Sequence, residues 1–162
     1  MTENPASATA DEDPSRFLAA NGALLMLTGL LVGVTVFAAP YPRLMLTAHI
    51  QFLVNGMVSV FAALLLKTSL SIVGRRSGRL IVWGHVLAWA VCVSEVGAAV
   101  WGANRALPIA AAQAGASGAA PWQETLILVC HVIPALFLIV AWTSLLRGVY
   151  RSRPTAKLAP VG

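Results

Sequence analysis

Four long apolar stretches constrain this chain more than any other feature of its sequence. They cover residues 17–39, 46–66, 80–102 and 123–146. Each is long enough for a helix to cross the hydrocarbon core of a membrane, which takes about 20 residues. Only 10% of the 162 residues are charged, against roughly a quarter in soluble domains. The sequence therefore predicts an all-α protein, an integral membrane four-helix bundle that forms one domain over residues 17–148.

The two ends of the chain have little apolar surface to bury. Residues 1–16 are rich in alanine, serine, proline and acidic side chains, which predicts a disordered N-terminal tail. Asp11, Glu12 and Asp13 precede the first apolar stretch, whereas a cleaved signal peptide carries positive charge there. We therefore interpret this stretch as a membrane span, and residues 149–162 as a basic cytoplasmic tail.

Basic residues gather at one end of the predicted bundle. The formal net charge is +5, and most of the arginine and lysine residues follow the second or the fourth span. These are Lys67, Arg75, Arg76, Arg79, Arg147, Arg151, Arg153 and Lys157. Basic residues next to spans mark the cytoplasmic side, so we expect a multi-pass protein of the cell inner membrane with both termini cytoplasmic. The pattern indicates topology in a lipid bilayer rather than a site for nucleic acid or lipid headgroups.

A long segment of small residues, 103–121, joins the third and fourth spans. Such a loop can fold over an opening in the bundle as a lid, and it can equally be a flexible, solvated linker. Cys92 and Cys130 lie inside predicted spans, where a thiol behaves as a small apolar group. We expect packing roles for both cysteines and no redox chemistry.

The second span carries polar side chains that are expensive to place in a membrane. Gln51, Asn55 and Ser59 recur at every fourth position and form one stripe. His49 lies about 120° around the helix from Asn55, so the two residues flank a groove. Because a neutral imidazole can bind a metal or haem iron, and because Gly56 continues the face of His49, this face leaves room for a flat macrocycle.

Further polar groups lie at similar depth on other spans. With a rise of about 1.5 Å per residue, Asn55, Glu95 and His131 all lie roughly 10–12 Å below the outer boundary, and His49 lies nearer to it. Glu95 could serve in hydrogen bonding between helices or in handling a substrate. His131 could be structural, a second ligand or an acid–base group. His85 lies near the opposite end, where an interhelical role is expected.

The sequence around His49 resembles the small four-span membrane isomerases that comprise hydroxylaminobenzene mutase and styrene oxide isomerase. The resemblance covers roughly residues 17–148. Its most specific part is the string Ala48-His49 followed by Asn55-Gly56-Met57. The other matching strings are Asn21-Gly22, Pro42-Arg43, Val100-Trp101-Gly102-Ala103, Pro108-Ile109-Ala110-Ala111 and Gln123-Glu124.

This resemblance implies a homotrimer with haem b bound between subunits and His49 as the ligand of the iron, the only metal expected. We place Gln51 and Gly56 beside the cofactor. Asn55, Glu95 and His131 are the candidate catalytic residues, next to a small hydrophobic aromatic substrate.

The outer-loop pattern from Trp101 to Ala111 is closer to the mutases than to the epoxide isomerases. We therefore predict rearrangement of an arylhydroxylamine to an aminophenol, with the haem iron as a Lewis acid. The alternatives are isomerisation of an aryl epoxide to an aldehyde, a non-catalytic haem b membrane protein, and a small transporter whose polar stripe lines a pathway.

Overall fold

The computed structural model describes residues 13–68 and 70–152, and within them it contains helices and no strand. Four helices are long and apolar enough to cross a membrane, which confirms the predicted four-helix bundle and indicates a multi-pass membrane protein. They are α1 (Pro14–Thr35), α2 (Pro42–Lys67), α3 (Arg75–Trp101) and α5 (Pro121–Arg151). The short 3₁₀ helix η2 (Val36–Ala38) extends α1, and the short helix α4 (Pro108–Ala114) lies between α3 and α5.

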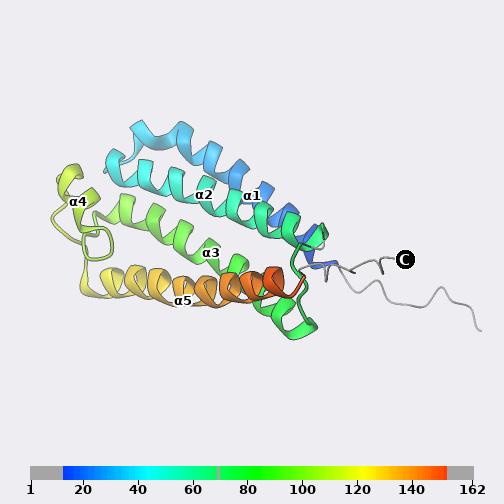
Figure 1. Cartoon of the computed structure of the whole chain (residues 1–162). Coiled ribbons are helices and arrows are strands. Elements are labelled where there is room, and N and C mark those ends of the chain that lie inside the picture. The colour runs from blue at the N-terminus through cyan, green and yellow to red at the C-terminus, as the bar shows by residue number, and fades with distance from the viewer. Residues whose placement is uncertain (1–12, 69, 153–162) are drawn as a thin grey trace, which may run out of the picture.

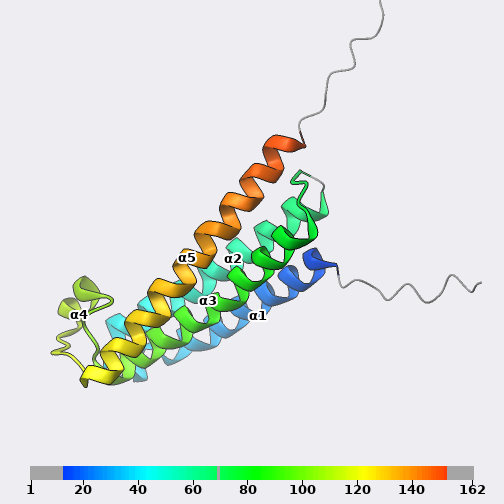
Figure 2. The same cartoon turned by 90° about the horizontal axis from the view of Figure 1, so that it is seen from below.

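The bundle consists of two helix pairs. The most extensive contacts join α1 to α2 and α3 to α5, and a smaller contact between α2 and α3 holds the pairs together. In Figure 1, α2 and α3 accordingly lie between α1 and α5. Figure 2 shows that α4 lies at one end of the bundle, while α1 begins and α5 ends toward the other.

Glycine residues allow α1 and α2 to approach closely. A Cβ atom added to Gly22 would lie 2.6 Å from the carbonyl oxygen of Gly56, and one added to Gly56 would lie 2.8 Å from that of Gly22. Close backbone approach at small residues is the usual way in which helices associate in a membrane. The space beside Gly56, where we expected a macrocycle, is therefore filled by α1, including the side chain of Met26.

The connection between α2 and α3 is tied to the end of α5. The Ser71 hydroxyl donates a hydrogen bond to the carbonyl oxygen of Leu145 at 2.8 Å. The backbone N–H of Ile72 donates to Gly148 at 3.3 Å, and the hydroxyl of Ser152 donates to Leu70 at 2.7 Å. The α2–α3 connection and the end of α5 thus lie together, and the basic residues of both meet at one end of the bundle.

The segment between α3 and α5 packs against the bundle, which favours the first of the two alternatives, a segment that folds over the bundle, over a flexible linker. Ala111 of α4 is fully buried against α2, and the Nε of Arg43 donates to the Oε1 of Gln113 at 2.8 Å. The carboxylate of Glu124 accepts backbone N–H groups of Asn104, Arg105 and Ala119 at 2.9–3.0 Å. This segment therefore covers the end of the bundle as a packed cap, which we call the outer cap (residues 103–120).

Both predicted tails are shorter than expected. Asp13 caps α1, because its carboxylate accepts hydrogen bonds from the backbone N–H and the hydroxyl of Ser15 at 3.0 and 2.9 Å. Residues 14–16 are therefore helical, and α5 likewise continues to Arg151. The remainder of the two predicted tails, residues 1–12 and 153–162, lies outside the described residues.

Candidate active site

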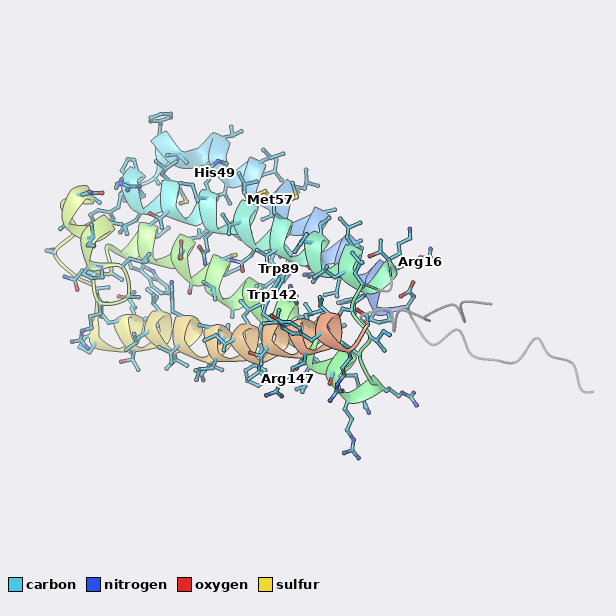
Figure 3. All side chains as sticks on the ribbon, viewed as in Figure 1. Arg16, His49, Met57, Trp89, Trp142 and Arg147 are labelled. Carbon is cyan, nitrogen blue, oxygen red and sulfur yellow. The ribbon has the colours of Figure 1, made fainter. Side chains whose placement is uncertain are left out.

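His49 lies on α2, toward the end of the bundle that carries the outer cap, and its side chain is half-buried (Figure 3). Its Nδ1 lies 2.7 Å from the carbonyl oxygen of Gly29 on α1. A carbonyl oxygen can only accept, so Nδ1 carries the hydrogen and donates it. In the neutral ring the lone pair is then on Nε2, which makes no hydrogen bond to the described residues. This arrangement is typical of ligating histidines, whose second nitrogen is held by a carbonyl or carboxylate.

Gly33 makes room for the imidazole of His49 against α1. A Cβ atom at Gly33 would lie 2.7 Å from both Nδ1 and Cε1 of the ring, closer than carbon and nitrogen atoms can approach without a shift. Glycines four residues apart, such as Gly29 and Gly33, are typical of close helix packing in membranes, but their spacing does not reveal that they receive a histidine. Together these two glycines fix the position and the tautomer of the ring.

Asn55 faces α3 rather than α1. Its side-chain amide donates to the carbonyl oxygen of Gln51 at 3.0 Å and to the Sγ of Cys92 at 3.7 Å, and the residue is 7% exposed. His49 and Asn55 therefore lie on different faces of α2, and each faces a different neighbouring helix, so they do not flank one groove as predicted. Gln51 lines a separate pocket of about 370 Å³ beneath the outer cap, together with Arg43, Thr47 and Ile50.

Glu95 and His131 form a pair between α3 and α5. The Oε1 of Glu95 lies 3.3 Å from the Nε2 of His131, and Glu95 is 2% exposed. The Oε2 of Glu95 is buried with no hydrogen-bond partner among the described residues. The structure thus brings together two of the three candidate catalytic residues, which lie 36 positions apart in the chain.

The surroundings of His131 determine where its protons lie. Its Nδ1 is 2.8 Å from the carbonyl oxygen of Ile127 and 3.4 Å from the hydroxyl oxygen of Ser94. That hydroxyl donates its own hydrogen to the carbonyl oxygen of Val91, so both neighbours of Nδ1 are acceptors and Nδ1 carries a hydrogen. A single proton then remains for the contact between Nε2 and Oε1. Whether it sits on nitrogen or oxygen, the pair can pass it across.

The Glu95–His131 pair and His49 lie in the same region of the bundle. Val96, next to Glu95, packs against the cluster that contains Met45 and Ala48 and against the cluster that contains Phe52 and Cys92. His49 lies between these clusters on α2. It is directed toward α1, however, whereas Glu95 is directed toward α5. Within one chain, no hydrogen bond joins the described atoms of His49 to those of the pair.

Other polar groups inside the bundle have structural partners. Asn21 accepts a hydrogen bond from the indole N–H of Trp89 at 2.9 Å and donates to the Ser59 hydroxyl at 3.3 Å, so it bridges three helices. The Nδ1 of His85 donates to the carbonyl oxygen of Ile81 on its own helix. His85 is buried near Trp142, and its Nε2 has no hydrogen-bond partner among the described residues. Cys92 is a buried free thiol, as expected of a packing residue.

Comparison with known proteins identifies the family to which this arrangement belongs. The comparisons with curated proteins and with solved structures gave no match. Residues 14–150, which run from the first residue of α1 to the last turn of α5, match the family model described as styrene oxide isomerase. This match includes His49, Asn55, Glu95 and His131, and the chain belongs to the styrene oxide isomerase family.

Proposed function

We propose that this chain is a membrane-embedded, haem-dependent isomerase that rearranges an arylhydroxylamine to an aminophenol. Membership of the styrene oxide isomerase family suggests an isomerase of that type. The finer assignment, a reaction like that of hydroxylaminobenzene mutase, rests on one observation: the buried Glu95–His131 pair, which can carry a proton.

The residues around His49 fit a haem group. The Nε2 atom is free to ligate iron because Nδ1 is held by Gly29, and Gly33 leaves the ring the space it needs. Among the described residues, no three histidine, cysteine or acidic side chains gather as metal ligands. A single histidine is sufficient for haem iron, because the porphyrin supplies the other nitrogen ligands. When bound, ferric iron supplies a Lewis acid that draws charge from an N–O or C–O bond.

The proposed reaction needs a proton to be moved as well as a bond to be broken. In phenylhydroxylamine the N–O bond breaks and a C–O bond forms at a ring carbon. That carbon loses a proton and the nitrogen gains one, so the product is an isomer and no oxidant is needed. Glu95 can accept the ring proton on its unpartnered Oε2, and the shared proton of the pair can return to nitrogen. We propose that Asn55 orients the substrate.

The alternative reaction, isomerisation of an aryl epoxide to an aldehyde, does not require proton transfer by these residues. When styrene oxide becomes phenylacetaldehyde, a C–O bond breaks and a hydride moves between neighbouring carbons, so no proton has to leave the substrate. An apolar site that excludes water would suffice for this chemistry. The family name favours this alternative, and the presence of a buried acid–base pair favours the mutase.

The opposite directions of His49 and Glu95 support a site that is shared between subunits. We propose a homotrimer in which the haem lies between subunits, so that His49 of one copy works with the Glu95–His131 pair of a neighbour. We also propose that the basic end of the bundle and both termini face the cytoplasm, because basic residues next to spans are retained there.

Turnover of the two model substrates tests the function. The purified protein, loaded with haem in detergent, is given phenylhydroxylamine or styrene oxide, and products are separated by chromatography. We expect 2-aminophenol from the first substrate. Glu95→Gln should lower kcat by about 10²-fold or more, the usual contribution of a general acid–base group, while Cys130→Ala, on the same helix as His131, should retain activity.

Three results would contradict this assignment. Conversion of styrene oxide alone would establish the epoxide isomerase in place of the mutase. Unchanged kcat in Glu95→Gln would show that Glu95 does not transfer the proton. No turnover of either substrate by haem-loaded protein would support a non-catalytic haem protein.

A further inference from the structure

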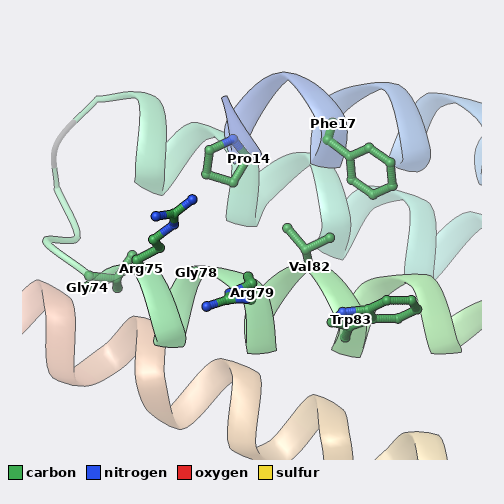
Figure 4. Close-up of a pocket in the computed structure, with 9 residues that line it drawn as sticks. Pro14, Phe17, Gly74, Arg75, Gly78, Arg79, Val82 and Trp83 are labelled. Carbon is green, nitrogen blue, oxygen red and sulfur yellow. The ribbon is translucent and has the colours of Figure 1, made fainter. Parts of the chain in front are cut away.

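A pocket of about 420 Å³ lies between the beginning of α1 and the beginning of α3, at the basic end of the bundle (Figure 4). Across this pocket, Pro14 of α1 lies opposite Arg75, and Phe17 lies opposite Val82 and Trp83 of α3. Its volume is within the range of ligand-binding pockets, roughly 300–1,000 Å³. It is far along the helices from His49 and from the Glu95–His131 pair, so the proposed reaction does not account for it.

The floor of the pocket is a glycine that faces empty space. Gly78 is buried, yet a Cβ atom added there would meet no atom within 4 Å. Gly22 and Gly56 differ in this respect, because the neighbouring helix fills the space beside each of them. Gly78 therefore does not serve close helix packing. It keeps open a space that a larger side chain would fill.

The pocket is positively charged and partly apolar. Arg75 and Arg79 lie one turn apart on α3, and no acidic side chain is among the described residues that line the pocket. The pocket also lies at the N-terminal end of α3, where the helix dipole is favourable for a negative charge. Phe17 and Trp83 are 42% and 58% exposed and continue the pocket along the apolar surface of the bundle.

We propose that this pocket binds an anionic phospholipid. The headgroup phosphate lies between Arg75 and Arg79, and an acyl chain runs over Phe17 and Trp83. Arginine forms strong, charge-assisted hydrogen bonds with phosphate, and tryptophan is enriched where membrane meets water. Basic pockets between transmembrane helices bind lipid headgroups in this way. From the sequence alone, these arginines are explained by membrane topology. The open pocket above Gly78 is the observation that indicates a binding site.

Lipid retention by the full-length protein tests the proposal. The protein is purified from mixed vesicles of dioleoyl phosphatidylglycerol and dioleoyl phosphatidylcholine, and bound lipid is counted by native mass spectrometry. We expect retained phosphatidylglycerol, reduced about tenfold by Arg79→Gln, which removes one charge, and by Gly78→Leu, which fills the space. Arg76→Gln is the matched control, because Arg76 is in the same turn and does not line the pocket.

The helical circular dichroism spectrum of each variant is recorded first, and Arg79→Gln carries the test if Gly78→Leu does not fold. Equal retention of phosphatidylglycerol by wild type and Arg79→Gln would overturn the proposal, as would equal losses in Arg79→Gln and the control. Displacement of the lipid by millimolar inorganic phosphate would show an anion site without a role for the acyl chain, and would overturn the assignment to a lipid. None of these outcomes depends on haem or on turnover.

Discussion

At the scale of single residues, the chemistry of His49 depends on a carbonyl oxygen of another helix. The 2.7 Å hydrogen bond to Gly29 decides which ring nitrogen is free, and Gly33 decides how closely the ring approaches α1. Partners of this kind orient a ligand and raise its basicity, and their loss typically weakens metal binding by 10–100-fold. The glycines of α1 thus belong to the proposed cofactor site although they carry no side chain.

Gly33→Ala tests this dependence. The added methyl group would lie 2.7 Å from the imidazole, so the ring must turn and weaken its hydrogen bond to Gly29. We expect haem affinity to fall by about 10-fold or more, as measured by titrating haem into the apoprotein and following its absorption. In Gly97→Ala the new Cβ meets its nearest neighbour, the Trp101 ring, at 3.4 Å, so this control should bind haem normally. Equal affinity in Gly33→Ala and wild type would contradict the role assigned to Gly33.

The sequence predicts the positions of these residues along and around their helices, but not which neighbouring helix each one contacts. Helical phase correctly separates His49 from Asn55, and depth correctly places Glu95 level with His131. Phase on one helix does not say which neighbour covers each face, however. From phase alone, the face of Gly56 is expected to leave room for a macrocycle, whereas α1 fills that space. The tautomer of His49 also depends on a backbone atom 20 residues away, which no local pattern reveals.

At the scale of elements, the outer cap depends on one carboxylate. Glu124, in the first turn of α5, is 2% exposed and accepts N–H groups from both ends of the cap. Its position near a helix N-terminus is favourable for a negative charge. Composition alone does not decide whether this segment is a lid or a flexible linker. Small residues without periodicity carry no packing signal, and the bonds that hold the cap are made by backbone groups.

Replacing Glu124 with Gln should loosen the outer cap. A neutral amide offers one acceptor oxygen for three backbone donors, and each hydrogen bond to a charged group contributes about 2 kcal/mol. We expect faster amide hydrogen exchange at Asn104, Arg105 and Ala119, measured by mass spectrometry on the purified protein. Thr125→Ala removes only an exposed hydroxyl that bonds within α5 and should leave the cap protected. Unchanged exchange in Glu124→Gln would show that other contacts hold the cap.

At the scale of the whole molecule, the sequence predicts four spans but not their pairing. Length and hydropathy identify each helix, whereas the pairing of α1 with α2 and of α3 with α5 depends on side-chain fit between distant segments. That pairing directs His49 toward α1 and Glu95 toward α5. This difference in direction supports the proposal that one site draws on two copies of the chain in a homotrimer.

Mixed assemblies of two inactive variants test the shared site. His49→Ala and Glu95→Gln are co-expressed with different affinity tags, and oligomers that contain both are purified in two steps and loaded with haem. Each variant alone should have at most about 1% of wild-type activity. A mixed assembly contains sites with an intact His49 from one subunit and an intact Glu95 from its neighbour, so we expect turnover to return. Mixed assemblies as inactive as either parent would place both residues of a site in one subunit.

If His49 holds haem iron in this protein, the visible absorption spectrum depends on that one side chain. The purified protein is supplied with haem in detergent, freed of excess haem and scanned for the Soret band. We expect a Soret band in wild type and in His131→Ala, and none in His49→Ala of unchanged helical content. A Soret band of full intensity in His49→Ala, or none in wild type, would overturn the assignment of His49 as the ligand of haem iron.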